Sequence, residues 1–198
     1  MKIERKISLL FLAFSLCLSL GACVPSIRMK QEALAKGDMN KGSVVVGTVS
    51  NNRGDEGGKN FELLGKVRGG YGNPFALTTE SGRGIDVVLK EVAKTSLEHS
   101  GYSTQQVVGK SFHLNIDVLN FWCDGYIDYK IAAEIKATLI NPMDGKLLAQ
   151  KIIAVQKGFA IPMGYSPMYE AFDEVINDMQ KQLLAFIQSQ EFQHAAKS

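Results

Sequence analysis

The sequence predicts an α+β fold: a mostly antiparallel sheet with two main helices packed on one face, after an N-terminal signal peptide and a tether. Several segments between residues 43 and 156 are dense in β-branched residues or alternate apolar and polar residues, as strands do. Two other segments, beginning near residues 85 and 167, repeat apolar residues at steps of three and four, which is typical of helices. The order strand, hairpin, helix, strand, hairpin, helix favours helices on one face of the sheet.

Residues 1–22 have the pattern of a signal peptide. A short basic segment, Met1–Lys6, is followed by a nearly continuous apolar run from Ile7 to Leu20. The run has about 14 residues, whereas a helix that crosses the hydrocarbon core needs about 20. We therefore expect residues 1–22 to be removed. A permanent transmembrane anchor and a plain secretory signal cut before Cys23 are the two alternatives.

The leader ends in Leu20-Gly21-Ala22-Cys23, which resembles the lipobox of bacterial lipoproteins. This resemblance implies that the Cys23 thiol receives a diacylglycerol, that the chain is cut before it, and that the new N-terminus is acylated, for example with palmitate. Each buried methylene contributes about 0.8 kcal/mol, so several acyl chains hold a protein at a membrane firmly. Because Val24 and not an aspartate follows, the resemblance implies the periplasmic face of the outer membrane, with the outer leaflet of the inner membrane as the alternative.

The composition of the remaining chain excludes several function classes. The leader holds three basic residues and one acidic residue, so residues 23–198 have 19 of each sign and are formally neutral. Nucleic acid favours proteins with a strongly basic face, so a neutral net charge gives no electrostatic reason to expect a nucleic-acid partner. Cys123 is the one cysteine outside the leader and lipobox, so we expect no internal disulfide and interpret Cys123 as a small buried apolar residue. An intermolecular disulfide or a reactive thiol is the alternative. His99, His113 and His194 are scattered, which predicts no metal site, and no cofactor is expected.

The first part of the mature chain is divided by composition. Residues 23–41 are polar and mixed, and we interpret them as the lipidated N-terminus and a tether that lifts a single periplasmic domain, residues 42–192, off the membrane. Ser43–Val49 is rich in valine and predicts a strand, followed by a turn-rich loop through residue 60. Phe61–Arg68 predicts a second strand.

Gly69-Gly70-Tyr71-Gly72-Asn73-Pro74 is the densest glycine cluster of the chain. Glycine accepts positive φ, and proline restricts both itself and Asn73, so the segment predicts a tight reversal that displays Tyr71. A phosphate-binding loop is the alternative, but the glycine spacing matches neither the dinucleotide fingerprint nor the P-loop. We interpret Tyr71 and Asn73 as part of a contact surface.

The middle of the chain predicts a short extended segment, Phe75–Thr79, a helix and a strand. One apolar stripe begins at Ile85 and recurs at helical steps to Leu97, and Gly101 is a suitable end. Residues 112–119 alternate, so that one face is apolar while His113, Asn115 and Asp117 point the other way.

The last part of the chain predicts a hairpin and a long helix. Strands at 129–140 and 147–156 flank a turn that has proline early and Asp-Gly late. An irregular loop, residues 158–167, carries Met163 and Tyr165, which we add to the contact surface. A broad apolar stripe then runs to Ile187, and residues 193–198 are expected to fray.

Taken in order, these segments resemble the YajG-like bacterial lipoproteins. The resemblance rests on the lipobox, a Val-rich strand ending in Asn52-Arg53, the Gly-Gly-Tyr-Gly-Asn-Pro loop, a helix ending at Gly101-Tyr102, the Leu114–Val118 strand and the hairpin. More distantly, the layout is similar to auxiliary lipoproteins of envelope ABC transporters. The YajG-like family has no agreed activity, so the resemblance implies a fold and an address but no catalytic residues.

Three functions follow from this sequence. We expect a non-enzymatic envelope lipoprotein that binds another envelope component, a protein or a lipid. An accessory subunit of a lipid or ABC transport system is the first alternative and would need an apolar groove between helix and sheet. A periplasmic hydrolase is the second alternative and would need a converging set of acid-base groups. His113, Asp117, Asp124 and Asp128 are near one another in sequence, but no motif joins them.

Overall fold

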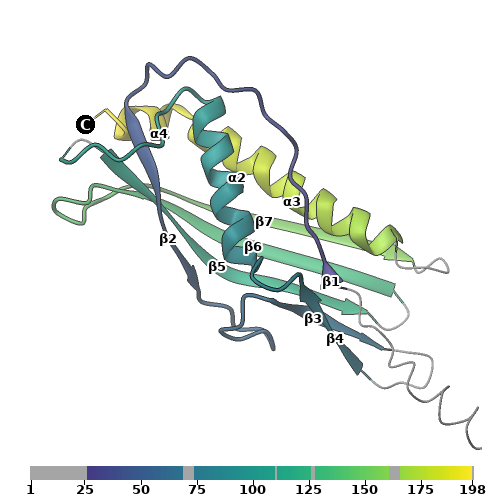
Figure 1. Ribbon diagram of the computed structural model, residues 1–198. Helices are drawn as coiled ribbons and strands as arrows, with labels where there is room; N and C mark the ends of the chain where they lie inside the picture. The colour runs from purple at the N-terminus through teal and green to yellow at the C-terminus, as the bar shows by residue number, and fades with distance from the viewer. Residues whose placement is uncertain (1–25, 69–73, 110, 126–127, 161–165, 198) are drawn as a thin grey trace, which may run out of the picture.

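A computed structural model describes residues 26–68, 74–109, 111–125, 128–160 and 166–197. In this part of the chain a seven-stranded mixed sheet carries the two longer helices on one face (Figure 1). The predicted α+β class is therefore confirmed. The strands are β1 (Ser26–Ile27), β2 (Ser43–Asn51), β3 (Leu63–Arg68), β4 (Pro74–Thr79), β5 (Ser111–Gly125), β6 (Asp128–Ile140) and β7 (Leu147–Ala160). The helices are α2 (Ile85–His99), α3 (Ser166–Ile187) and α4 (Gln190–Ala195).

The strand order is β1-β4-β3-β5-β6-β7, and β2 also pairs with β5. The longest ladders, β5 with β6 and β6 with β7, are antiparallel, as is β3 with β4. Three shorter ladders are parallel: β1 with β4, β2 with β5, and β3 with β5. The sequence patterns do not anticipate these parallel pairs, because each joins segments far apart in the chain.

The β6–β7 hairpin matches its sequence prediction closely. Its turn is held by two short side chains: the Asn141 Oδ1 atom accepts from the Met143 N–H at 3.0 Å, and the Asp144 Oδ1 atom accepts from the Lys146 N–H at 3.0 Å. Gly145 has a φ of 70°, a conformation that side chains other than glycine rarely adopt.

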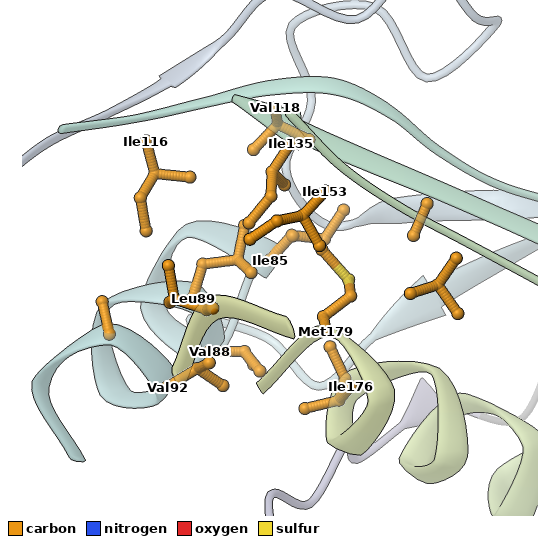
Figure 2. Close-up of a cluster of buried hydrophobic side chains, with 14 of the residues drawn as sticks. Ile85, Val88, Leu89, Val92, Ile116, Val118, Ile135, Ile153, Ile176 and Met179 are labelled. Carbon is orange, nitrogen blue, oxygen red and sulfur yellow. The ribbon is translucent and has the colours of Figure 1, made fainter. Parts of the chain in front are cut away.

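The core fills the layer between the helices and the sheet. Alternate residues of β5, β6 and β7 meet the apolar stripes of α2 and α3 (Figure 2). Ile116, Ile135 and Ile153, one from each strand, are fully buried there, and Phe121 stacks on Phe172 with ring centroids 6.2 Å apart. We call the other face of the sheet, which the helices leave uncovered, the open face. His113, Asn115 and Asp117 alternate with buried residues and so lie on it, as predicted.

Strand β5 is longer than the sequence indicates. The alternation of apolar and polar residues breaks at Asn120, which predicts the end of a strand. In the structure the strand continues, with a register shift between Val118 and Asn120. A bulge inserts one extra residue, so Phe121 and Cys123 return to the helix-covered face and pairing continues to Gly125.

Residues 28–42, which we call the strap, run along the helices from β1 to β2 (Figure 1). The sequence predicts a tether here, but these residues are bound to the domain. The Lys30 and Glu32 N–H groups donate to Asp173 and Asn177 of α3, each at 2.7 Å. The buried Gln180 amide donates to the Glu32 carbonyl at 3.2 Å. The strap has no helix of its own and is held by these contacts, by the buried Met29 side chain and by backbone bonds such as Gly37 N–H to the Glu98 carbonyl at 3.0 Å.

The C-terminal residues also differ from the expected frayed tail. Ser189 caps α4 by accepting from the Phe192 N–H at 3.2 Å. The Phe192 ring is fully buried and meets Phe186 and Tyr102 edge-on, with centroids 5.2 and 5.8 Å away. Gln193 to Ala195 belong to this capped helix and Ala196 is 7% exposed, so most of the predicted frayed tail, residues 193–198, is packed on the domain.

Candidate functional site

The residues that the sequence analysis selected for function lie outside the described part of the chain. These are the lipidation candidate Cys23 and the contact candidates Tyr71, Asn73, Met163 and Tyr165. The described residues next to 69–73 and 161–165 show where these two segments join the sheet. Arg68 and Pro74 are register partners at the end of the β3–β4 ladder, and Ala160 pairs with Asp128 at the end of β7. The strand order puts all of these at the same end of the sheet (Figure 1).

Asp117 and Asp124, two acidic residues of the hydrolase hypothesis, do not lie together. Asp117 forms an ion pair with Lys136 at 2.9 Å and accepts from Asn52 at 3.1 Å. Asp124 is seven residues further along β5, opposite Lys130. No three His, Cys, Asp or Glu side chains within the described residues gather in a way that would hold a metal ion. Asp117 is occupied by Lys136 and Asn52 and is well separated from Asp124, so these two carboxylates do not form the paired acid and base that hydrolysis needs.

A pocket of about 260 Å³ lies where β5, β6 and β7 meet. Its lining includes Asn120 at the β5 bulge, Glu134, Gln156 and the small side chains of Ala132 and Ala154. The Asn120 Oδ1 atom has no hydrogen-bond partner among the described residues. Glu134 is the one ionisable group in the lining, and the volume is below that of most small-molecule sites, so the pocket does not support a reaction.

The transport hypothesis requires an apolar groove between helix and sheet. In the described residues that layer is closed by side chains such as Ile85, Leu89, Val118 and Met179, all at most 1% exposed (Figure 2). The described helices also include none that is long and apolar enough to span a bilayer. The packing between the layers accordingly provides no lipid-binding groove within this part of the chain.

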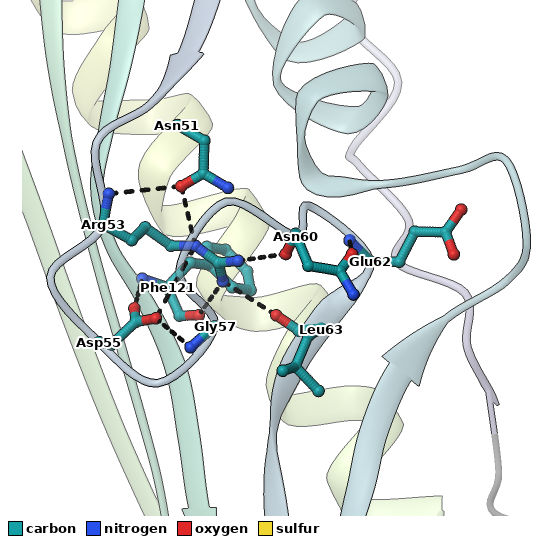
Figure 3. Close-up of polar contacts among 8 residues, drawn as sticks. All are labelled: Asn51, Arg53, Asp55, Gly57, Asn60, Glu62, Leu63 and Phe121. Atoms are coloured by element: carbon teal, nitrogen blue, oxygen red, sulfur yellow. Dashed lines mark hydrogen bonds and ion pairs between the residues drawn. The ribbon is translucent and has the colours of Figure 1, made fainter.

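Arg53 is the most unusual charged residue of the fold, because its side chain is completely buried. Its guanidinium donates to the carbonyl oxygens of Leu63 at 2.9 Å, Phe121 at 3.0 Å and Asn60, and to the Asn51 Oδ1 atom at 3.1 Å (Figure 3). Burial lowers the pKa of Arg53, and the nearby Asp55 carboxylate, 3.8 Å away, partly offsets this effect. The guanidinium is thus occupied by the protein itself.

The position of Arg53 explains this arrangement. Strand β5 pairs with β2 as far as Val118 and with β3 only from Cys123, so Phe121 faces a gap between two neighbours. The Asp55 Oδ2 atom accepts from the Phe121 N–H at 3.1 Å, while Arg53 donates to the Phe121 carbonyl. These two side chains supply the hydrogen bonds that a strand would otherwise supply. The Arg53–Asp55 pair is therefore structural and not a ligand site.

Cys123 lies on the helix-covered face of β5 and is fully buried and free. Burial, with a smaller contribution from the Asp124 charge, raises the pKa of the thiol to about 12. Since the thiolate is the reactive form, Cys123 is chemically inert at neutral pH. The interpretation of Cys123 as a small buried apolar residue is confirmed.

No known family model matches this chain, and no curated protein sequence matches it. Solved structures with a similar fold do exist. Protein XCC0632 from Xanthomonas campestris, of the DUF330 family, has a TM-score of 0.55 at 13% identity, covering 86% of this chain and 99% of that chain. The two chains share a fold, and at this identity the likeness extends no further.

Two weaker structural matches are bacterial lipoproteins. A minor lipoprotein from Acinetobacter baumannii has a TM-score of 0.40 at 9% identity, with 71% of this chain and 91% of that chain covered. Lipoprotein GNA1162 from Neisseria meningitidis has a TM-score of 0.37 at 16% identity, with 68% and 94% covered.

Proposed function

We propose that the protein is a non-enzymatic bacterial envelope lipoprotein of the YajG-like type, held by acyl chains on Cys23, which presents its α+β domain to another envelope component. The observation that carries this proposal is the Leu20-Gly21-Ala22-Cys23 segment immediately before the first strand, which begins at Ser26. The proposed address is the periplasmic face of the outer membrane, because Val24 follows the cysteine. The outer leaflet of the inner membrane is the alternative address.

The binding part of the proposal is supported by exposed apolar side chains on a well-packed domain. Val107 and Val108 precede β5, and Met143 and Leu147 lie in the β6–β7 turn and at the start of β7. Their side chains are 45%, 92%, 77% and 55% exposed, respectively. Tyr71, Asn73, Met163 and Tyr165 remain the sequence-based candidates for contact. Aromatic residues and methionine are enriched in protein interfaces, so Met143 of the first set and Tyr71, Met163 and Tyr165 of the second are suitable anchors for a partner.

The lipid anchor is tested with Cys23→Ser in cells. We expect the wild-type chain to fractionate with membranes and the variant to appear in the soluble periplasmic fraction. Density-gradient separation of inner and outer membranes then distinguishes the two addresses. A Cys23→Ser chain that still fractionates with membranes would show that the lipid is not the anchor.

The partner is tested by crosslinking in intact cells and identification of the captured proteins. We expect a partner that is lost, or at least tenfold depleted, with Tyr71→Ala or Tyr165→Ala. Retention of every partner by both variants would contradict these loops as the contact surface. Capture of a transporter subunit would favour the transport accessory function, which otherwise lacks support from the filled helix–sheet layer.

A further inference from the structure

One end of the sheet, which we call the anchor end, is defined by a single row of register partners. Val67 pairs with Phe75 and with Gly125, Gly125 pairs with Tyr129, and Tyr129 pairs with Phe159. Five strands thus finish or begin at the same level. The β6–β7 turn, residues 141–146, lies at the opposite end of the sheet, which we call the hairpin end (Figure 1).

Strand β1 enters the sheet from the anchor end. It runs parallel to β4, with Ser26 opposite Thr78 and Ile27 opposite Thr79. Phe75 precedes Thr78 by three residues, and Cys23 precedes Ser26 by the same number. Three fully extended residues span about 11 Å at most. Covalent geometry alone therefore keeps Cys23 close to the β4 corner of the anchor end.

The chain after β1 cannot lengthen this connection, because it is bound to the domain. Ile27 and Met29 are each 1% exposed, and the strap beyond them is hydrogen-bonded to α3 through Lys30 and Glu32. In the sequence, only Val24 and Pro25 separate Cys23 from the first residue of β1. A headgroup layer is roughly 5–8 Å thick, from the difference between whole-bilayer and hydrocarbon thickness. The reach of the connection barely exceeds that layer.

We infer that the domain sits directly on the bilayer, with the β4 corner of the anchor end against the lipid headgroups and the hairpin end directed into the periplasm. This inference rests on the proposed lipidation of Cys23. Phe75 is 40% exposed at that corner, next to exposed Pro74, and an exposed phenylalanine gains free energy by entering the boundary between headgroups and acyl chains. The occupant of the β4 corner is the lipid headgroup layer, which leaves the β7 side of the anchor end, the sides of the domain and the hairpin end to a partner protein.

Single cysteines placed at the two ends test this orientation. The mature chain has no other reactive thiol, because Cys23 is acylated and Cys123 is buried with a raised pKa. The lipidated Phe75→Cys and Met143→Cys proteins are reconstituted in vesicles of phosphatidylethanolamine and phosphatidylglycerol. Their reaction rates with a membrane-impermeant maleimide are compared with those in detergent and with those of unlipidated domains that carry Cys23→Ser, so that position 23 adds no reactive thiol. Ala76→Cys, at an exposed neighbouring position, replaces Phe75→Cys if that variant does not fold.

We expect labelling of Phe75→Cys to slow at least tenfold in vesicles, while Met143→Cys reacts at the same rate in all three states. Insertion of about 20 Gly/Ser residues after Pro25 adds roughly 25 Å of reach and is expected to restore Phe75→Cys labelling. Equal rates for Phe75→Cys in vesicles and in detergent, with the protein still bound to the vesicles, would overturn the orientation alone. Failure of the wild-type chain to be acylated or to bind vesicles would instead overturn the proposed lipid anchor.

Discussion

The two sides of β5 show two ways of completing a sheet. On one side β6 pairs with it from Tyr129 to Ile140, interrupted only by a bulge. On the other side β2 and β3 share the strand, and Arg53 and Asp55 fill the gap between them. A ladder distributes its hydrogen bonds over many backbone groups, whereas the gap depends on two charged side chains. We call the side of β5 that faces β2 and β3 the split side and the side that faces β6 the continuous side. The stability of the split side is therefore more sensitive to single substitutions.

Arg53→Leu is expected to have the largest effect. It leaves the carbonyl groups of Leu63, Phe121 and Asn60 without their donor and leaves Asp55 without its cation. Removing one partner of a buried ion pair costs about 3–5 kcal/mol, and we expect a loss of this size in urea unfolding of the soluble domain. Arg53→Lys keeps the charge but not the planar fork, so it should recover only part of the loss. A loss below about 1 kcal/mol for Arg53→Leu would contradict the structural role.

Asp55→Ala is expected to rank second. It removes the acceptor for the Phe121 N–H and for the Gly57 N–H, and also the counter-charge of Arg53. Unsatisfied buried groups of this kind cost about 1–3 kcal/mol each. Because both side chains serve the same gap, the double variant with Arg53→Leu should be clearly less destabilised than the sum of the two single variants. Strict additivity in this double-mutant cycle would show that the two residues act independently.

Gly57→Ala tests the packing against the guanidinium. A Cβ atom at Gly57 would lie 2.6 Å from three atoms of the Arg53 guanidinium, which its hydrogen bonds hold in place. We expect a loss of about 1–3 kcal/mol, the range for overpacking of a close-packed site. Gly54→Ala in the same loop is the matched control, because its Cβ would meet nothing within 4 Å. Equal melting temperatures for both variants would count against a rigid guanidinium.

Lys136→Met on the continuous side is expected to have the smallest effect. Lys136 of β6 pairs with Asp117 of β5 at 2.9 Å, but both side chains are partly exposed, 34% and 23%. Partly exposed ion pairs contribute about 0–1 kcal/mol, and salt screens them further. Urea unfolding at low and high salt should show a small loss that disappears in high salt. A loss as large as that of Arg53→Leu would remove the distinction between the two sides of β5.

The continuous side could be predicted from the sequence because its information is local. Alternation and the Asp144-Gly145 turn specify β6 and β7, and the apolar stripes specify α2 and α3. The split side could not be predicted. Residues 50–60 have the composition of a solvent-exposed turn, and only the folded chain shows that Arg53 is buried against Phe121. Arginine is rarely buried completely, so the residue type predicts an exposed side chain at position 53, whereas the folded chain buries it.

Two other features were not predicted from the sequence: the attachment of the strap and the full length of β5. The strap is polar in sequence, and its attachment depends on α3 side chains such as Gln180, which is distant in the chain. The end of β5 was obscured by the bulge, where two successive residues break the alternation. The candidate contact residues Tyr71, Asn73, Met163 and Tyr165 were selected from loop composition alone and remain predictions. The register of the strands nevertheless places the ends of both loops at the anchor end of the sheet, the end from which β1 enters, although β1 and β7 lie at opposite edges.

The most direct test of the account is the mass of the N-terminal peptide of the protein isolated from bacterial membranes. The account predicts a peptide that begins at Cys23, with a diacylglycerol on sulfur and a third acyl chain on the new N-terminus. A chain that begins at Met1 and carries an unmodified Cys23 thiol would contradict both the lipid anchor and the orientation inferred from it.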